Sequence, residues 1–326
     1  MSVKLDLKDK KIIYELDVDS RQSASQLAKK VGVSKQGCTF KINNLVKKGI
    51  INSFVTVLNT PLMGHLSFRM YFKLIDISPS KETEFRNWLI NHNLIPWVVG
   101  CEGLWDYIIV VFPKDFTEFE SFSTELNNNW GNFVEKKDIA LVTEAHHFRS
   151  GYLLEKKVDI PPLTYAGQPK EVYKLDEIEN KILAMLCENS RAELVQIGKQ
   201  LNLPSKTVAY RIKKLREINL IEGYTLTVDY SKLGFERYKV FIRSKSMDQE
   251  REKSFIEWAR MHPYCLYYSK SIASSDVELE LIVKNSIHLR EIVAEIRKNF
   301  NDVIRAYEVM KIYQEFKLNF IPWVNP

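Results

Sequence analysis

Two copies of one pattern run through this sequence at a fixed spacing. Matching residues lie 170 positions apart: Leu5-Asp6 with Leu175-Asp176, Ser20-Arg21 with Ser190-Arg191, Gly64 with Gly234, Trp88 with Trp258, and Asp106 with Asp276. An internal repeat constrains the architecture more than any local pattern, because both copies must form the same fold. We therefore expect two similar units in one chain, at residues 5–154 and 175–322.

Size and composition are those of a globular protein with several domains. The 326 residues suffice for about two to four domains, and no apolar run is long enough to cross a membrane. The first residues, MSVKLDLKDKK, lack the apolar core of a signal peptide. The four cysteines are widely spaced and form no CxxC pair. We therefore expect free thiols, no metal or cofactor, and a cytoplasmic location.

Basic residues gather in two stretches without acidic residues. The net charge is only +6, but no Asp or Glu occurs from Ser20 to Ile75 or from Leu194 to Arg216. Both stretches contain several lysines and arginines. Local positive charge of this kind suits a polyanion, and double-stranded DNA is the expected partner.

Each basic stretch follows the pattern of a helix-turn-helix unit. Capping residues precede the expected helices: Asp6, Ser23 and Ser34 in the first unit, Asp176 and Ser205 in the second. Gly32 and Asn202 stand where a tight turn needs positive φ, and the small Ala28 and Gly198 allow another helix to pack close. The segments GIINSFVTVLN and NLIEGYTLTVD alternate in polarity, so each unit is expected to end in a two-stranded wing.

The third helix of each unit is the candidate DNA-reading element. An apolar stripe at helical spacing marks its buried side: Cys38, Ile42 and Leu45, then Val208, Ile212 and Leu215. The candidate DNA-binding residues on the other side are Ser34, Lys35, Gln36, Thr39, Phe40, Asn43 and Lys47, and Ser205, Lys206, Thr207, Tyr210, Arg211, Lys213 and Lys214. A lone lysine-rich helix is more often a solvated face, but here the face recurs within the same pattern. Because the first face presents amides and the second lysines, we expect one unit to read bases and the other to contact phosphate.

Two segments resemble a known family of regulators. LAKKVGVSKQGCTFKINNLVKKGIIN and IGKQLNLPSKTVAYRIKKLREINLIEGYTLTVDYSKLGF are similar to the Lrp/AsnC (feast/famine) transcription regulators, the second more closely. The resemblance occurs in both copies of the repeat, which together make up nearly the whole chain. It implies a DNA-binding regulator whose second domain pairs sheet to sheet and binds a small effector, such as an amino acid.

The rest of each unit reads as strand, helix, strand, strand, helix, strand. This βαββαβ order predicts a ferredoxin-like domain, with two helices on one face of an antiparallel sheet. The other face must be covered, and a second such sheet is the natural cover. The expected α+β chain has winged helix-turn-helix domains at 1–60 and 173–230, effector-sensing ferredoxin-like domains at 61–154 and 231–322, and a linker at 155–172 that contains Pro161-Pro162, Gly167 and Pro169.

A glycine-containing turn in the first unit is the candidate effector site. Gly100 and Gly103 permit close approach of a ligand to the backbone, and Asp106 can hold an ammonium group. The alternative is an ordinary hairpin with a structural aspartate. The second copy, from Ser269 to Asp276, has no glycine, so the two units are not expected to sense the same molecule.

The duplication predicts that one chain supplies both halves of the family's usual dimer. The two units would pack as a pseudo-dimer, further assembly of chains being open, and the preferred DNA site need not be palindromic. Two alternatives use the same architecture. One is an enzyme like the sirohaem decarboxylases, with His146, His147, Arg149, His262 and Tyr264 as candidate groups. The other is an architectural chromatin protein without a specific operator.

Overall fold

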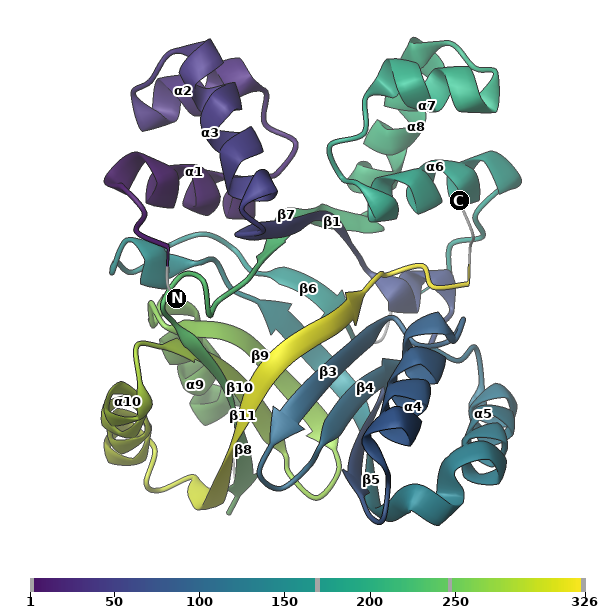
Figure 1. Cartoon of the computed structure of the whole chain (residues 1–326), viewed down its shortest axis with the longest axis vertical. Helices are drawn as coiled ribbons and strands as arrows, with labels where there is room; N and C mark the ends of the chain where they lie inside the picture. Colours follow the sequence, from purple (N-terminus) through teal and green to yellow (C-terminus); the bar gives the residue numbers. More distant parts are fainter. Residues whose placement is uncertain (1–2, 168–170, 246–247, 324–326) are drawn as a thin grey trace.

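The computed structural model describes residues 3–167, 171–245 and 248–323. Two three-helix units lie side by side at one end of the molecule, and a β-barrel flanked by helices forms the other end (Figure 1). Within the described ranges, no helix has the length and apolar character needed to cross a membrane. The two-unit α+β architecture that the repeat predicts is confirmed.

The three-helix units form as their capping residues predict. The first unit consists of α1 (Leu7–Val18), α2 (Ala24–Val31) and α3 (Lys35–Lys47), and the second of α6 (Glu177–Glu188), α7 (Leu194–Leu201) and α8 (Ser205–Glu217). The side chains of Asp6, Ser23, Ser34 and Asp176 all accept a backbone N–H at the starts of their helices. The cap expected at Ser205 is wrong, because Pro204 is the N-cap and no side-chain hydrogen bond closes that helix start.

The turns between the second and third helices explain three small or polar residues. Gly32 and Asn202 adopt φ of 73° and 55°, in the left-handed region that glycine and asparagine tolerate best. At Gly198 an added Cβ would lie 2.5 Å from the carbonyl oxygen of Leu203. The second copy therefore needs glycine where the first carries Ala28, and it is the turn rather than another helix that approaches it.

The two ferredoxin-like sheets join into one closed barrel. The first supplies β2 (Phe68–Leu74), β3 (Trp97–Glu102), β4 (Tyr107–Val111) and β5 (Val134–His147), and the second supplies β8 (Glu236–Ser244), β9 (Cys265–Ile272), β10 (Val277–Val283) and β11 (Ile304–Leu318). The strand order is β2-β4-β3-β11-β8-β10-β9-β5, and β5 also pairs with β2. Each sheet thus covers the inner face of the other, as predicted. An eight-stranded barrel is narrow enough for side chains to fill its interior.

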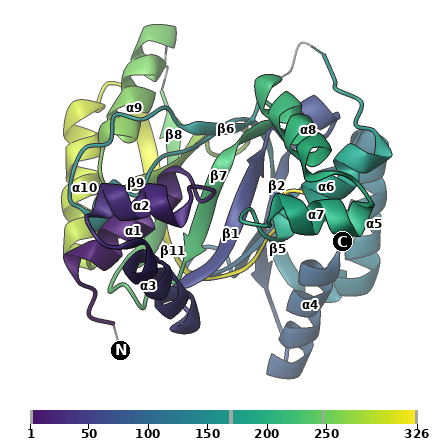
Figure 2. The same ribbon diagram turned by 90° about the horizontal axis from the view of Figure 1, so that it is seen from above.

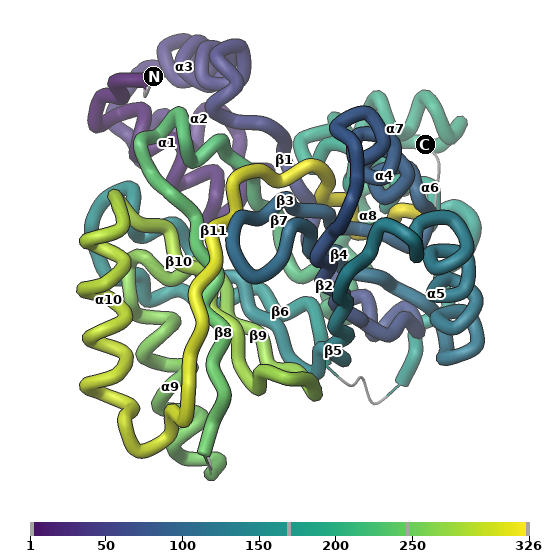
Figure 3. Tube along the Cα trace, turned by 60° about the horizontal axis from the view of Figure 1, so that its bottom comes forward, coloured from purple at the N-terminus to yellow at the C-terminus, as the bar shows by residue number. Residues whose placement is uncertain are grey.

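Four helices cover the outside of the barrel in pairs. The first pair is α4 (Pro79–Asn91) and α5 (Phe116–Trp130), and the second is α9 (Gln249–Met261) and α10 (Ser286–Asn299). Figure 3 shows the two pairs on opposite sides of the barrel. Short 3-10 turns occur at Thr60–Met63, Gly131–Phe133 and Gly151–Leu153.

The wing prediction is wrong in its pairing. Each expected wing forms a single strand, β1 (Ile51–Leu58) or β7 (Ile221–Val228), and the two pair antiparallel with each other. Alternating polarity identifies a strand but not its partner, and here the partner belongs to the other unit. The two crossing strands link the three-helix units above to the barrel below (Figure 1).

The expected linker is partly ordered. Leu163–Ala166 forms β6, which pairs with β5 and buries Leu163 and Ala166, so this stretch is a packed element rather than a spacer. Pro161 and Pro162 precede it. Gly167 adopts φ of 155° beyond its end, and Pro169 lies outside the described residues.

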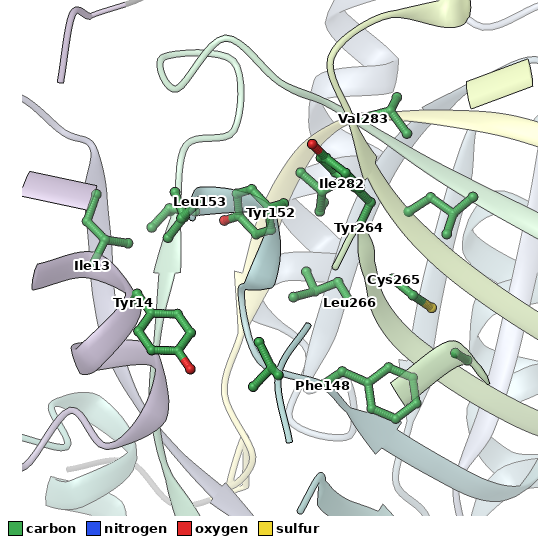
Figure 4. Packing of buried hydrophobic residues seen from close by; sticks show 14 of the residues in the cluster. Ile13, Tyr14, Phe148, Tyr152, Leu153, Tyr264, Cys265, Leu266, Ile282 and Val283 are labelled. Atoms are coloured by element: carbon green, nitrogen blue, oxygen red, sulfur yellow. The ribbon is translucent and has the colours of Figure 1, made fainter. Parts of the chain in front are cut away.

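The hydrophobic cores cross between the two units. The core of the first three-helix unit is continuous with the core of the second ferredoxin-like domain. Figure 4 shows Tyr152 and Leu153 lying between Ile13 of α1 and Leu266 of β9, with Phe148 near Leu266. The second three-helix unit packs instead on β1 and on Phe320 near the C-terminus. Neither repeat is therefore a self-contained globule.

Candidate nucleic-acid interface

The outward face of α3 displays the amide-rich set that the sequence predicts. Cys38, Ile42 and Leu45 are buried, whereas Ser34, Lys35, Gln36, Thr39, Phe40, Asn43 and Lys47 are all exposed. Phe40 is 71% exposed, so its ring is accessible on this face. An exposed aromatic ring among amides and lysines can contact bases, because thymine methyl groups accept apolar contacts.

The outward face of α8 is basic, and only part of the predicted set is free to contact DNA. Lys206, Tyr210 and Lys213 are exposed, whereas Ser205 and Thr207 are half-buried. Tyr210 is 68% exposed and occupies the position equivalent to Phe40. The two units therefore present one aromatic ring each at the same place, surrounded by amides in one unit and by lysines in the other.

Two predicted DNA-binding residues of α8 are engaged inside their own unit. The Arg211 guanidinium contacts the Asp176 carboxylate at 2.5 Å and lowers the pKa of that carboxyl group. The Lys214 ammonium donates to the Tyr173 hydroxyl at 2.8 Å and lies 3.5 Å from Glu179. Lys41, which is equivalent to Arg211, contacts Asp6 at 2.7 Å in the same way. Arg211 hence connects α8 to the start of α6, and the DNA-contact prediction for Arg211 is revised.

A pair of arginines fastens the two three-helix units together at the pseudo-twofold axis. The Ser20 and Ser190 hydroxyl oxygens lie 2.5 Å apart. The Arg21 guanidinium donates to the carbonyls of Ser190 and Ala192, the latter at 3.2 Å. The Arg191 guanidinium makes the equivalent contacts to the carbonyls of Ser20 and Gln22. We call this set, residues 20–22 and 190–192, the arginine clasp.

The arginine clasp was not predicted from the sequence, although the sequence contains a signal for it. Ser20-Arg21 recurs as Ser190-Arg191, and an identical pair in two diverged copies fits a contact with its own equivalent across a twofold axis. Each guanidinium also lies over an aromatic ring of a crossing strand, Arg21 over Tyr224 and Arg191 over Phe54. The clasp and the β1–β7 pairing together fix how the two units lie relative to each other. Figure 2 shows β1 and β7 lying between the two three-helix units.

The predicted effector residues lie together, but Asp106 already has a structural task. Its carboxylate accepts the Leu74 backbone N–H at 2.7 Å and contacts the Lys73 ammonium at 2.8 Å. Asp276 accepts the Ser244 N–H at 2.6 Å in the same manner. Both aspartates therefore close the end of the first strand of their sheets, which is the structural alternative raised above.

The two glycines of that turn differ in what they accommodate. Gly103 adopts φ of 124°, and an added Cβ at Gly100 would lie 2.4 Å from the Tyr313 ring. Gly100 thus makes room for an aromatic side chain of the other sheet. An open groove runs beside them, along Lys73, Asp76, Glu82 and Tyr313.

The candidate enzyme residues do not form one constellation. His146 contacts Glu144 at 2.6 Å and Thr164 at 3.0 Å. Arg149 donates to the backbone carbonyl of Asp17 at 2.9 Å, and His147 lies 3.9 Å from the Asp17 carboxylate.

His262 and Tyr264 lie at the other ferredoxin-like domain, where Nδ1 of His262 accepts the Tyr264 backbone N–H. Among the residues that the structure describes, no cluster of three or more His, Cys, Asp or Glu side chains is arranged to hold a metal ion.

Comparison with known proteins agrees with this geometry. The family described as winged helix-turn-helix DNA-binding matches residues 5–52 and 175–222. The transcriptional regulator AzlB of Bacillus subtilis is 31% identical over 125 residues, which is 37% of this chain and 78% of AzlB. The regulator LrpC of the same organism is 32% identical over 93 residues, 28% of this chain and 65% of LrpC. For some such relatives the match therefore spans less than two thirds of their length.

Solved structures of a sirohaem decarboxylase match the chain nearly end to end. The sirohaem decarboxylase NirDL superposes with a TM-score of 0.62, covering 98% of this chain and 94% of its own, at 14% identity. Identity this low shows a shared fold and nothing more. By its two helix-turn-helix matches and its sequence relatives, the chain belongs to the Lrp/AsnC family of transcriptional regulators, in tandem-duplicated form.

Proposed function

We propose that the chain regulates transcription by binding double-stranded DNA with two unlike heads held at a fixed spacing. The observation that carries the proposal is the pair of outward helix faces on α3 and α8, fastened to each other by the arginine clasp. One chain then does what two identical chains do in a dimer. In this proposal α3 reads bases through Gln36, Asn43 and Phe40, and α8 contacts phosphate through Lys206 and Lys213.

DNA binding is tested with matched substitutions at equivalent positions. Phe40→Ala and Tyr210→Ala remove the same exposed ring from each head, and neither side chain is in the core, so both variants should fold. Fluorescence anisotropy is measured on labelled duplexes over a range of salt concentrations. We expect Phe40→Ala to reduce discrimination between sequences and Lys206→Gln to reduce the salt slope by about one ion.

Three results separate the proposal from its alternatives. Saturable binding to a preferred sequence, stronger than to bulk DNA, supports a regulator. Equal affinity for all sequences with a steep salt slope would instead indicate an architectural chromatin protein. Absence of binding to any duplex at low salt would contradict the proposal altogether.

The enzyme alternative is disfavoured by the sites on offer. His146 and Arg149 are tied into local contacts, and the buried cavity beside His147 has a volume of about 60 Å³, far too small for a tetrapyrrole. We therefore propose that the chain is not a decarboxylase. Titration with sirohaem should leave the tetrapyrrole absorption spectrum unchanged. A saturable spectral shift would instead support the enzyme alternative.

A small effector, further assembly and cellular location complete the proposal. An amino acid bound beside Gly100, Gly103 and Asp106 would have to replace the contacts of Asp106 with Lys73 and Leu74. Asp106→Asn separates the two roles: a loss of effector response without loss of stability supports the site.

Light scattering measures assembly beyond the single chain. A reducing, cytoplasmic location fits the four buried free thiols.

A further inference from the structure

A buried cavity lies between the barrel and the crossing strands β1 and β7. Its volume is about 60 Å³. Because one water-sized position takes about 10–15 Å³, it offers room for roughly four to six non-hydrogen atoms. Val55 and Val57 of β1 and Thr225 of β7 line one side, and Arg69 and Arg237 of the barrel line the other. No predicted site residue of either DNA-binding head lines it.

A buried ion network forms the barrel side of this cavity. Arg237 donates through Nε at 2.8 Å and Nη2 to Glu280, and through Nη1 at 2.9 Å to Glu315. The Lys239 ammonium contacts both Glu278 and Glu280 at 2.9 Å. Each carboxylate of the network thus already contacts at least one cationic side chain.

Donors, by contrast, are left over. Arg69 uses Nη1 for Ser269 and Glu278, and its buried Nε has no partner among the described residues. Tyr165 and Tyr267 also line the cavity, and a phenol can donate a hydrogen bond. Burial raises the pKa of both phenols, so they stay protonated and can donate.

The local charge also favours an anion. Three cationic side chains, Arg69, Arg237 and Lys239, face two fully buried carboxylates, Glu278 and Glu280. The network also contains Glu315, so its three cations and three carboxylates balance. The members that line the cavity itself are two arginines, Arg69 and Arg237, and one carboxylate, Glu280, so the cavity wall has one more positive than negative side chain, which a monoanion would neutralise.

We propose that this cavity binds a small carboxylate, with its oxygens on Arg69, Tyr165 and Tyr267 and its short apolar chain against Val55, Val57 and Val142. A free ammonium group is disfavoured, because two arginines, Arg69 and Arg237, line the cavity. The site is distinct from the turn at Gly100–Asp106, which lies beside Tyr313.

A polar contact connects the cavity to the first DNA-binding head. Thr225 lines it and donates through Oγ1 to the Asp17 carboxylate of α1 at 2.7 Å, and Asp17 also accepts the Ser150 N–H at 2.7 Å. At the position equivalent to Asp17, the second unit has the buried Cys187. Binding of a ligand in the cavity should therefore affect the first head through Thr225 and Asp17. This consequence rests on the proposed DNA-binding function, whereas the binding site does not.

The test measures ligand binding to the full chain, without DNA, so its failure is distinct from failure of the proposed function. Sodium acetate and sodium propionate are the probes, alanine is the ammonium-bearing comparison, and sodium chloride at equal ionic strength is the control. Calorimetry should give saturable binding of one propionate per chain, and thermal denaturation should show a rise in Tm that chloride does not produce.

Two variants locate the binding. Val142→Phe fills the cavity and should abolish the heat. Arg69→Lys keeps the positive charge that faces Glu278 but removes the free Nε edge, and should weaken propionate binding at least about tenfold. Position 239, equivalent to 69, carries lysine naturally, so this variant should fold.

The proposal is overturned if neither acetate nor propionate gives saturable heat. It is also overturned if Arg69→Lys binds propionate as tightly as the natural chain, or if alanine binds more tightly than propionate.

Discussion

The contacts of Asp17 with Ser150 and with Thr225 of the crossing strand β7 predict that the two DNA-binding heads are held with different strength. Asp17 is 1% exposed, and its carboxylate accepts two hydrogen bonds of 2.7 Å, from the Ser150 N–H and the Thr225 hydroxyl. The equivalent Cys187 is also buried and makes no such polar contact within the described chain. Asp17→Ala and Cys187→Ala are therefore a matched pair at equivalent positions.

The expected magnitudes follow from these contacts. Two hydrogen bonds to a carboxylate contribute about 3–6 kcal/mol together, and removing the buried charge recovers part of this through its lost desolvation cost. We expect Asp17→Ala to reduce the free energy of opening of α1 by about 3 kcal/mol. Cys187→Ala leaves only a small cavity and should cost α6 about 1 kcal/mol.

Hydrogen exchange measured by mass spectrometry reports each helix separately. A loss of about 3 kcal/mol accelerates amide exchange in α1 by about a hundredfold, and a loss of about 1 kcal/mol accelerates exchange in α6 by about fivefold. Asp17→Asn keeps the acceptor for Ser150 and should give an intermediate result. The reasoning is refuted if Asp17→Ala leaves exchange in α1 unchanged, or if the cysteine variant has the larger effect.

Three further predictions concern stability and spacing. Gly198→Ala should reduce the free energy of unfolding by about 1–3 kcal/mol in urea titrations, because its Cβ would meet the Leu203 carbonyl; an unchanged midpoint would contradict the steric argument. Burial lowers the pKa of His147 to about 4, below about 6.5 in the unfolded chain, so the unfolded state binds more protons and stability falls as pH drops from 6.5 toward 4. The loss between pH 7 and 4.5 should be about 2 kcal/mol and absent in His147→Gln; equal pH dependence in both proteins would count against this assignment. The double variant Arg21→Ala/Arg191→Ala releases the clasp, so it should tolerate about five extra base pairs between half-sites better than the natural chain does; the natural chain tolerating them equally well would show that the clasp does not set the spacing.

Much of the fold could be predicted because its signals are local. The caps at Asp6 and Asp176, the turn residues Gly32 and Asn202, and the βαββαβ order all act within a few residues of the chain. The repeat then predicted that the two sheets cover each other. What the sequence could not supply was the partner of each crossing strand, because pairing between β1 and β7 depends on closure of the whole molecule.

The barrel interior shows the same limit more sharply. Glu278 and Glu280 alternate with apolar residues in β10, and such alternation normally places the polar face in water. Both glutamates are buried, because barrel closure turns that face inward toward Arg69, Arg237 and Lys239. In the first unit the equivalent positions are the apolar Ile108 and Val110. Only the comparison of the two copies could have marked these glutamates as unusual.

The candidate DNA-binding site was predicted in outline but not residue by residue. Helical periodicity separates the buried from the exposed face of α8, and it correctly leaves Lys206 and Tyr210 outside. Periodicity does not reveal that Arg211 meets Asp176, since that contact joins two helices far apart in the chain. The recurrence of Ser20-Arg21 as Ser190-Arg191 was the only sequence signal for the arginine clasp, whose contacts form only in the assembled pseudo-dimer.

Selection of preferred duplexes from a random pool tests the central claim most directly. The full chain is incubated with randomised duplexes, and the bound fraction is sequenced over several rounds. A pseudo-dimer with an amide-rich head and a lysine-rich head predicts one well-defined half-site, with a weaker and different preference at a fixed distance from it. A perfect inverted repeat would contradict the account, because it would mean that both heads read DNA in the same way.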